Sequence, residues 1–443
     1  MCGIVGMVQA DDLEENGVLP ALAADALTAL QHRGTESAGL VGSDGADRQH
    51  LDIVKGHGLA RDVFTEESLV SLRGSRVIIG HNRYSTAGRK RWTINCVQPF
   101  VVYTAIGTVA IAHNGELVDA KRKREEVLQE GVGLSTDTDS ELIAQMVAKA
   151  IALNYKLVMT YDRVYAIRDP YGNRPLCVGS IYCPQAPEVP FAYCAASESC
   201  ALPSGSKLNC EVQPGEIVEI TRKGIRSVCQ MKPQNPQAMC IFEYVYFARN
   251  DSIIEGQQVQ TVREECGRIL AQEAHVDADI VSNSGITYEP CLHRNSYVGR
   301  SFIQPSTAMR QSAIHKKFGV LRKNVEGRRI VLIDDSIVRG NTMRILVQML
   351  LSSGAKEVHL RIASPPVKLP CFMGINIPTK EELLASRRNI EQITEYIGAT
   401  SVAYLSEEGL RKAVQSGVER SKTFNVGHCM GCLTGNYPVP IEF

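Results

Sequence analysis

Residues 329–363 read RIVLIDDSIVRGNTMRILVQMLLSSGAKEVHLRIA, and this stretch decides the fold of the C-terminal half. Arg329–Ile333 has the continuous apolar run of a buried strand, and Glu357–Ala363 is a second strand. Between them, Thr342–Ser353 has helical apolar spacing and ends at Gly354. Strand, helix and strand in this order form a βαβ unit with parallel strands and a right-handed crossover. The sequence therefore predicts an α/β domain with a parallel sheet.

Two adjacent acids, Asp334 and Asp335, follow the first of these strands, and a small polar loop from Ser336 opens the helix. Ligands of open α/β sheets bind at the carboxyl ends of strands, and helix N-termini bind phosphate through free N–H groups. Two carboxylates suit sugar hydroxyls and a bound Mg²⁺. The alternative is a solvated turn with Asp335 or Ser336 as the helix cap. We disfavour it because adjacent acids after an apolar strand are poor core material.

The rest of the C-terminal half is predicted to be mainly helical. Val259–Ala274 has a helical pattern, and Ala278–Ser282 is a short strand. Thr379-Lys380-Glu381-Glu382 has the spacing of a capping box and predicts a helix start. The tail beyond it is expected to stay helical until a cysteine-rich end.

The N-terminal half, to about residue 222, mixes short strands with helices, which predicts a sheet-rich α+β layer structure. A linker is predicted around Pro233, Asn235 and Pro236. The predicted strands include Arg76–Gly80, Thr108–Ala112 and Arg163–Ile167, and the predicted helices are Leu19–Gln31 and Ser140–Leu153.

The composition limits the class of protein. A chain of 443 residues has room for two domains. The 48 basic and 48 acidic residues give zero net charge, so bulk electrostatics indicate neither nucleic acid nor a membrane as partner. Fourteen cysteines without a secretory context indicate a reducing compartment, and we expect the protein to be cytoplasmic.

Cys2 is the strongest candidate for a catalytic residue. If Met1 is removed, this residue carries both a thiol nucleophile and an α-amino base. Three later segments supply possible partners: Arg83 just past a strand, Asn114-Gly115 in a turn, and Asp139 at a helix start. Taken singly, these segments fit a disordered end, a surface pair, a turn and a helix cap.

Together these residues resemble the class II glutamine amidotransferases, which are N-terminal-nucleophile hydrolases with an αββα sandwich. The resemblance implies that Cys2 attacks the glutamine amide and that Asn114 and Gly115 form the oxyanion hole. It also implies that Arg83 and Asp139 bind the α-carboxylate and the α-ammonium of glutamine. A Cys–His dyad with His32, His81 or His113 is the competing mechanism, and Thr35 departs from the polar residue usual in the family. The resemblance covers about 220 residues and includes Gln31-His32-Arg33-Gly34, Arg168–Leu176 and Ser197-Glu198-Ser199.

The run from Asp334 to Thr342 resembles the phosphoribosyl-pyrophosphate (PRPP) motif of type I phosphoribosyltransferases. The resemblance implies that Asp334 and Asp335 hold the ribose hydroxyls and Mg²⁺. The residues implied to cradle the 5-phosphate are Ser336, Arg339, Gly340, Asn341 and Thr342.

Both halves together resemble the amidophosphoribosyltransferases, which implies a glutamine amidotransferase domain at 2–230 and a phosphoribosyltransferase domain at 240–443. The implied reaction converts glutamine, PRPP and water to 5-phosphoribosylamine, glutamate and pyrophosphate, the first step of de novo purine synthesis. Purine nucleotides are implied as inhibitors, and a homotetramer or homodimer as the assembly. Cys240–Arg249, Tyr297–Arg300 and Gly374–Thr379 also match the family.

Cys429-Met430-Gly431-Cys432 is a C-x₂-C pair, which alone is weak evidence for a metal site. Resemblance to the iron–sulfur branch of the family implies a structural [4Fe–4S] cluster. The alternative is a set of buried, redox-inert thiols. The implied ligands are Cys240, Cys371, Cys429 and Cys432.

Two regions are shorter than the family pattern. Between Asp139 and Arg168 there is room for one helix and one strand. After the strand predicted at Ala278–Ser282, the segment 283–288 runs quickly to Asn295, without the full loop that holds pyrophosphate. The chain is therefore an incomplete gene model or splice form, or its acceptor site is impaired. The alternative function is a catalytically reduced PRPP-binding paralogue that keeps only glutaminase activity or a regulatory role. Asparagine synthetases and hexosamine-forming synthases would need another acceptor domain.

Overall fold

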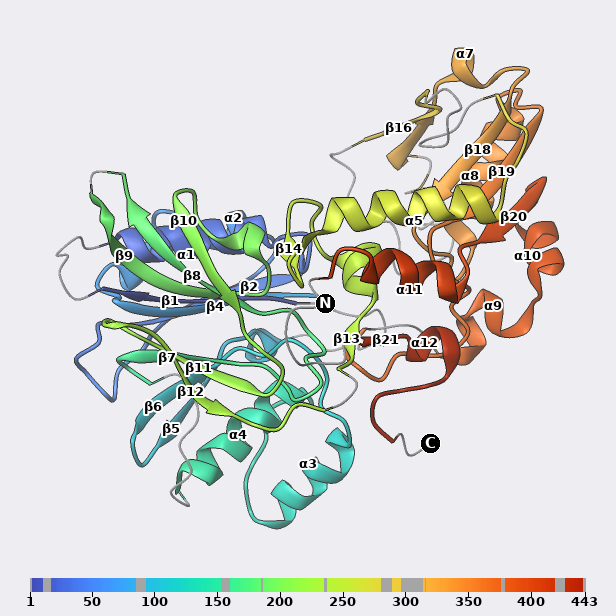
Figure 1. Cartoon of the computed structure of the whole chain (residues 1–443). Helices are drawn as coiled ribbons and strands as arrows, with labels where there is room; N and C mark the ends of the chain where they lie inside the picture. Colours follow the sequence, from blue (N-terminus) through green and yellow to red (C-terminus); the bar gives the residue numbers. More distant parts are fainter. Residues whose placement is uncertain are drawn as a thin grey trace.

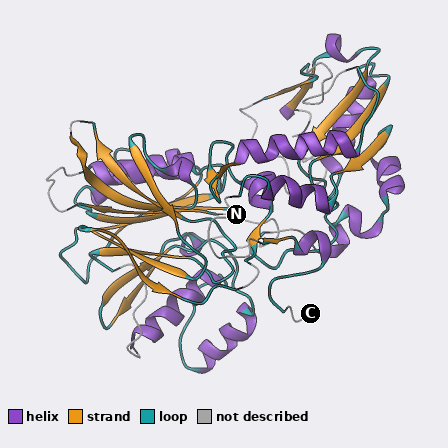
Figure 2. Cartoon of the chain, in the orientation of Figure 1, coloured by secondary structure: helices purple, strands orange, loops and turns teal. Residues whose placement is uncertain are grey.

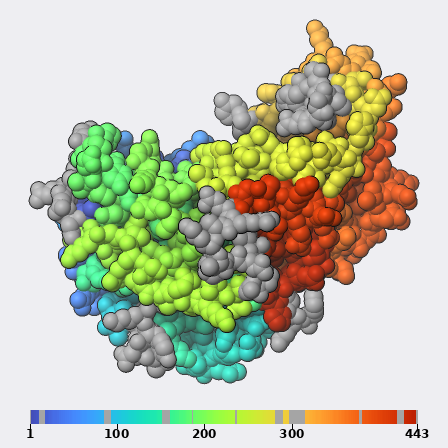
Figure 3. All heavy atoms as spheres, in the orientation of Figure 1, coloured from blue at the N-terminus to red at the C-terminus, as the bar shows by residue number. Residues whose placement is uncertain are grey.

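A computed structural model describes most of the chain, and its elements fall into two parts that lie side by side (Figure 1). The N-terminal part is rich in strands, whereas helices dominate the C-terminal part (Figure 2). In the space-filling view, the yellow, orange and red C-terminal residues form the side opposite the blue and green N-terminal layers (Figure 3). The described residues are 2–10, 17–84, 93–152, 160–184, 186–234, 237–279, 289–295, 314, 316–375, 379–418 and 427–440.

An antiparallel seven-stranded sheet with the order β10-β8-β9-β1-β4-β2-β3 forms the first layer of strands. Cys2 directly precedes its central strand β1, so the sheet fixes the candidate nucleophile. The strands are β1 (Gly3–Gln9), β2 (Ser37–Ser43), β3 (Asp52–His57), β4 (Val77–Arg83), β8 (Cys177–Cys183), β9 (Ala186–Ala196) and β10 (Ser206–Glu211).

A second layer of strands packs on the first and encloses an apolar core. Gly6 of β1 lies where the sheets approach closely, because a Cβ there would be 2.9 Å from Val164 Cγ1 of the facing sheet. Val8 of β1 and Ile220 of β11 are fully buried in the core between the sheets. The second layer contains β7 (Arg163–Ile167), β11 (Glu216–Thr221) and β12 (Gly224–Gln230), with the hairpin β5 (Phe100–Thr104) and β6 (Gly107–Ile111).

Helices cover both outer faces of this double sheet (Figure 1). The order helix, sheet, sheet, helix confirms the predicted αββα sandwich. The first sheet is covered by α1 (Val18–Ala29) and α2 (Ala60–Val63), and the opposite side by α3 (Ala120–Gln129) and α4 (Asp139–Ala152). The 3₁₀ turns of this part are η1 (Ser68–Leu72), η2 (Ile94–Cys96) and η3 (Ser199–Ala201).

The predicted βαβ unit is confirmed, and it belongs to a parallel sheet with the order β18-β19-β20. Its helix α8 begins at Asn341, one residue before the predicted start. The helix α5 runs along the other side of this part and packs against α11 (Figure 1). The sheet and its helices are β18 (Arg329–Asp334), α8 (Asn341–Ser352), β19 (Glu357–Ile362), β20 (Ser401–Tyr404), α5 (Val259–Glu273), α10 (Ile390–Ile397) and α11 (Glu407–Gln415).

Short elements join the two parts and close the C-terminal end. A parallel pair, β13 (Met239–Cys240) and β21 (His428–Cys429), brings the start of the C-terminal part to the tail of the chain. The remaining short elements are η4 (Glu243–Phe247, a π-helical turn), β14 (Ile253–Ile254), β15 (Gln257–Gln258), β16 (Leu292–Arg294), β17 (Phe318–Val320), α7 (Arg322–Val325), η6 (Lys380–Glu382), α9 (Leu384–Arg387) and α12 (Gly431–Thr434).

Two predictions for the tail are wrong. The chain after Thr379 forms only a 3₁₀ turn, without a side-chain cap hydrogen bond from that residue. Leu383 is in an extended conformation (φ −77°, ψ 119°), so it separates the 3₁₀ turn from the short helix α9. The capping box of this region is instead Asn389 with Gln392, at the start of α10.

The tail is also not wholly helical, because β20 is the third parallel strand of the sheet. Val402 is its only fully buried side chain, so the strand lacks a strong local apolar pattern, and pairing with β19 determines it. The strand predicted at Ala278–Ser282, and the shortened loop after it, lie largely outside the described residues. Within the described part of the chain, no helix is long and apolar enough to cross a membrane.

Candidate active sites

Cys2 and Arg83 lie at the same end of two paired strands. Gly3 of β1 pairs with Asn82 of β4, so the preceding Cys2 and the following Arg83 are neighbours in the antiparallel register. Gly34 packs against this point, because a Cβ there would lie 2.5 Å from the carbonyl carbon of Arg83. Burial lowers the pKa of Arg83, while Cys2 and Cys96 oppose the shift. The guanidinium stays charged, because even a lowered arginine pKa lies far above neutral pH.

The backbone of Cys2 is held by a buried arginine. Arg33 Nε donates to the Cys2 carbonyl oxygen at 2.9 Å. Its two terminal nitrogens donate to Glu243 at 3.0 Å each, and Nη1 also donates to Glu198. Burial alone would lower the pKa of Arg33, but Glu243 and Glu198 raise it above its ordinary value. The guanidinium therefore links the backbone of Cys2, through Nε, to Glu243, through its two terminal nitrogens.

Asn114 and Gly115 follow β6 in a loop with an open donor. Asn114 Nδ2 is buried and has no hydrogen-bond partner among the described residues. A buried, unpaired donor costs free energy unless a ligand pairs with it. Gly115 has φ +142, which an L side chain rarely adopts. The loop thus offers an amide donor and an unusual backbone conformation side by side.

One short segment connects Arg83 to this loop. Arg83 Nη1 donates to the carbonyl of Cys96. Two residues later, Gln98 Oε1 accepts from the His113 backbone N at 2.7 Å. The predicted carboxylate-binding arginine and the Asn114 loop are therefore positioned by the same stretch of chain.

Asp139 is the first residue of α4, and its carboxylate contacts the Asn114 loop rather than capping its own helix. Its Oδ2 accepts from the backbone N of Leu117 at 3.0 Å. His113 Nδ1 lies 4.0 Å from the same oxygen. The carboxylate keeps 23% of its side-chain surface exposed, which leaves room for a cationic ligand.

The three histidines of the competing Cys–His mechanism have other surroundings. The ring of His32 contacts Glu198 at 2.8 Å and the Ala29 carbonyl at 3.1 Å. Burial, with a smaller effect of Arg83, lowers the pKa of His81 to about 3. Burial also lowers the pKa of His113, although Asp139 opposes the shift. A histidine with such a low pKa is a poor acceptor for a thiol proton at neutral pH.

A cavity of about 550 Å³ lies beside the loop, between the sheets. Its walls are mostly apolar and include Ile4, Asn114 and Gly115. Met373 and Val439 of the C-terminal part also line it. The loop therefore faces a cavity to which both parts of the chain contribute.

The second candidate site lies at the carboxyl end of β18, as the βαβ pattern predicts. Burial and the neighbouring Asp335 raise the pKa of Asp334 to about 7. Burial also raises the pKa of Asp335, although a 2.6 Å hydrogen bond from Ser336 and the charge of Arg263 oppose the shift. A bound cation or hydroxyl donors would stabilise the charged form of these two adjacent, desolvated carboxyls.

The loop after the acids turns into α8 at Gly340. This residue has φ +76, and a Cβ there would lie 2.7 Å from Leu384 Cδ2. Arg339 pairs with Glu382 at 2.7 Å, and Asn341 accepts from the Tyr396 hydroxyl at 3.2 Å. A surface pocket of about 760 Å³ lies beside them. Thr342 follows Asn341 in the first turn of α8, so all seven predicted phosphoribosyl residues lie in one strand–loop–helix segment.

The four predicted cysteine ligands come together from three regions of the chain. Cys240 of β13 pairs with Cys429 of β21. Cys432 lies in α12. Its backbone carbonyl accepts from the backbone N atoms of Lys368 and Leu369, which are close to Cys371 in sequence. Burial raises the pKa of Cys240 to about 12, with smaller contributions from Cys429 and Cys371 and opposition from Arg174. Four thiols in one buried place are a suitable donor set for a soft metal.

Several residues of these sites carry no sequence signal of their own. Arg33 and Glu198 lie within motifs of the resemblance, but only the tertiary contacts give them a position. Glu243 likewise lies within the run Cys240–Arg249 that matches the family, and Arg263 lies in the predicted helix Val259–Ala274. Their importance comes from burial next to an opposite charge, which no local pattern reveals.

Comparison with known proteins finds relatives over the whole length of the chain. Residues 90–186 match the family described as the glutamine amidotransferase domain. The chain is 45% identical to the amidophosphoribosyltransferase of Rattus norvegicus over 508 aligned residues, which covers 100% of this chain and 98% of the rat protein. It is 37% identical to the Bacillus subtilis enzyme, with coverage of 99% and 94%. The alignment to the rat protein is longer than the 443 residues of this chain, which agrees with the internal shortening.

A solved structure extends the match to three dimensions. The B. subtilis glutamine PRPP amidotransferase, complexed with ADP and GMP, superimposes with a TM-score of 0.84 at 37% identity, covering 100% of this chain and 98% of that one. The fold is thus an N-terminal-nucleophile amidotransferase sandwich followed by a type I phosphoribosyltransferase domain. Full-length matches of this identity show that the chain belongs to the amidophosphoribosyltransferases.

Proposed function

We propose that this enzyme forms 5-phosphoribosylamine from PRPP with ammonia from glutamine, the committed step of purine synthesis. The observation that carries the proposal is the presence, in one chain, of a nucleophile site at Cys2 and a paired-acid site at Asp334 and Asp335. The family matches over the whole length support the same reaction. The domains correspond to residues 2–230 and 240–443.

At the first site, once Met1 is removed, the Cys2 thiol attacks the side-chain amide of glutamine, and its own α-amino group passes the thiol proton to the leaving ammonia. The C–N bond breaks as a thioester forms, and water then hydrolyses this thioester to glutamate and the free thiol. The open Asn114 amide and the Gly115 N–H stabilise the oxyanion, which is worth about 10²–10³ in rate. Arg83 binds the α-carboxylate and Asp139 the α-ammonium, since both charges lie close to the Asn114 loop. The occupied or weakly basic histidines disfavour a Cys–His dyad.

At the second site, Asp334 and Asp335 hold the ribose hydroxyls and Mg²⁺. The 5-phosphate lies in the loop that opens α8, where free backbone N–H groups attract phosphate. The residues of this loop are Ser336, Arg339, Gly340, Asn341 and Thr342. When bound, Mg²⁺ neutralises the charge that develops on the departing pyrophosphate.

We further propose that Cys240, Cys371, Cys429 and Cys432 hold a [4Fe–4S] cluster. Such a cluster would join the tail to the body of the enzyme, because its ligands come from three separate regions. Iron and sulfide content measured on the purified protein, together with the absorbance of the cluster, tests this proposal. A protein without iron, whose thiols all titrate, would contradict it.

The setting of the enzyme follows from the family. The B. subtilis relative is complexed with ADP and GMP, so we propose feedback inhibition by purine nucleotides. We also propose a homotetramer or homodimer. We propose a cytoplasmic location, because none of the fourteen cysteines forms a disulfide and a reducing compartment suits such a chain.

The decisive experiment compares glutamine-dependent and ammonia-dependent synthesis with glutamine hydrolysis alone. We expect pyrophosphate release in both synthetic assays. The alternative is a paralogue that hydrolyses glutamine or binds PRPP without transfer, and the shortened segment 283–288 favours it. Glutamate release without pyrophosphate release would establish that alternative and overturn our proposal.

A further inference from the structure

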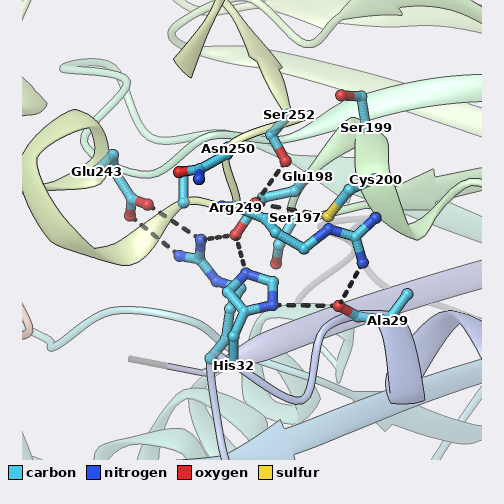
Figure 4. Close-up of polar contacts among 12 residues, drawn as sticks. Ala29, His32, Ser197, Glu198, Ser199, Cys200, Glu243, Arg249, Asn250 and Ser252 are labelled. Carbon is cyan, nitrogen blue, oxygen red and sulfur yellow. Dashed lines mark hydrogen bonds and ion pairs between the residues drawn. The ribbon is translucent and has the colours of Figure 1, made fainter. Parts of the chain in front are cut away.

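The buried charges between the two parts of the chain centre on two glutamates (Figure 4). Glu243 lies in the π-helical turn of the C-terminal part and is 0% exposed. Its two oxygens accept from both terminal nitrogens of Arg33 at 3.0 Å, a bidentate arrangement. Arg174 Nη1 contacts the same carboxylate at 3.4 Å. One carboxylate of the C-terminal part thus contacts two buried arginines of the N-terminal part, and Glu198 supplies a second negative charge beside Arg33.

The first arginine connects Glu243 to the nucleophile. Arg33 is 1% exposed, and its Nε holds the carbonyl of Cys2 at 2.9 Å. Arg33 Nη1 also donates to Glu198. The Glu198 carboxylate accepts in turn from the Ser252 hydroxyl at 2.6 Å and from the Arg249 backbone N at 2.9 Å. Both of these last partners belong to the C-terminal part, so the Arg33 guanidinium is oriented mainly from outside the sandwich.

The second arginine connects Glu243 to the oxyanion loop. Arg174 Nη2 donates to the backbone carbonyl of Met373. The next residue, Gly374, packs directly on the loop, because a Cβ there would lie 2.8 Å from the carbonyl carbon of Gly115 and 2.9 Å from the Glu116 backbone N. A displacement of this segment would therefore move the residue that donates to the oxyanion.

We propose that Glu243 is a positioning residue for glutamine hydrolysis. Through Arg33 it fixes the backbone of Cys2, and through Arg174 it fixes the segment that supports Gly115. The inference rests on the proposed function, because it assumes that these two residues act on glutamine. Its consequence is that the glutaminase site is complete only when the C-terminal part is docked on the sandwich.

The same cluster contains His32, Glu198 and Cys200, whose ligand atoms lie within 4.8 Å of one another (Figure 4). A metal ion does not explain this group. Glu198 already accepts from Arg33 and Ser252, and a cation would face the buried Arg33 guanidinium. Burial alone would raise the pKa of Glu198, but Arg33 and His32 hold it well below its usual range. The group is part of the charge network that Glu243 completes.

The test compares Glu243→Gln with Glu219→Gln in the full-length enzyme. Glu219 is a matched control, since it is 2% exposed and pairs with Arg163 and Arg226 in the sandwich. For Glu243→Gln we expect kcat for glutamine hydrolysis to fall about 10-fold to 100-fold, as for other small displacements of reacting groups. KM for glutamine should change little, because Arg83 and Asp139 are untouched. Ammonia-dependent synthesis should stay close to that of the unmodified enzyme.

The control variant should keep its glutaminase kcat. It should lose less thermal stability than Glu243→Gln, because its partners Arg163 and Arg226 are 34% and 70% exposed, whereas Arg33 and Arg174 are buried. An unchanged kcat in Glu243→Gln would refute the inference, and so would equal losses in the glutaminase and ammonia-dependent assays. If Glu243→Gln does not fold, Arg174→Lys replaces it. This variant keeps a positive charge beside Glu243 but loses the hydrogen bond from Arg174 Nη2 to the Met373 carbonyl. An unchanged kcat would therefore also refute the inference.

The unmodified enzyme distinguishes a failure of the proposed function from a failure of the role proposed for Glu243. If it does not hydrolyse glutamine, the proposed function fails. If it does and Glu243→Gln does so equally well, only the positioning role of Glu243 fails.

Discussion

Asp334→Asn should make the ligand-free protein more stable while it destroys the acceptor site. Asp334 lies next to Asp335 at the end of β18, and burial together with this neighbour raises its pKa from 3.8 to about 7. The folded protein therefore keeps a proton on this carboxyl that the unfolded chain releases. Stability then falls as pH rises from about 4 to about 7, because the unfolded state binds fewer protons in that range.

The size of the effect follows from the shift. One pKa unit corresponds to about 1.4 kcal/mol, so a rise of about three units sets an upper limit of about 4 kcal/mol at pH 8. Because Asp334 and Asp335 titrate as a coupled pair and both are only partly buried, the gain should lie below this limit. Each kcal/mol raises the Tm by about 2–4 °C in domains of similar size. The variant should thus melt several degrees above the unmodified protein at pH 8.

The assay is thermal unfolding between pH 5.5 and pH 8 in the presence of a chelator and without PRPP. The gain should be largest at pH 8 and should shrink at pH 5.5, where the unmodified carboxyl is protonated. Adding PRPP with Mg²⁺ should stabilise only the unmodified protein, because ligands raise the Tm of the state that binds them. PRPP-dependent synthesis should be lost, and glutamine hydrolysis should persist.

Asp279→Asn is the control of opposite sign. Three hydrogen bonds, from the side chain and the backbone N of Arg329, lower the pKa of Asp279 to about 2, so this carboxylate stabilises the folded state at pH 8. Its loss should lower the Tm at pH 8. An Asp334→Asn variant that melts at or below the temperature of the unmodified protein, with a parallel pH profile, would refute the reasoning.

Three further predictions test the remaining site residues. Cys2→Ser should abolish the use of glutamine and spare ammonia-dependent synthesis; loss of both activities would instead indicate a structural role. Asn114→Ala should lower kcat for glutamine hydrolysis by about 10²–10³ with little change in KM, and a change in KM alone would argue against the oxyanion hole. Cys432→Ser should lower iron and sulfide content and thermal stability, whereas the exposed Cys210 can be changed to serine without either loss. Iron that stays bound to Cys432→Ser would remove this residue from the ligand set.

Much of the fold could be predicted because strong local patterns agreed with the tertiary structure. The strand at Arg163–Ile167 and the helix from Val259 have the bounds expected from periodicity, to within one residue. The errors lie where local preference is weak or overruled. The strand β20 exists through its pairing with β19. The helix expected from Thr379 is interrupted by the extended Leu383, and α9 begins only at Leu384.

For the candidate sites, too, some features follow from local sequence and others only from the tertiary structure. The sequence by itself determined the reactive groups, because a thiol at Cys2, an amide at Asn114 and paired acids after a strand carry their chemistry wherever the chain places them. Only the tertiary structure decided what holds them. Glu243 and Arg33 are 210 residues apart and become partners only when the two parts dock. The physical reason is that burial sets the strength of a charge interaction, and burial is a property of the whole fold rather than of any segment.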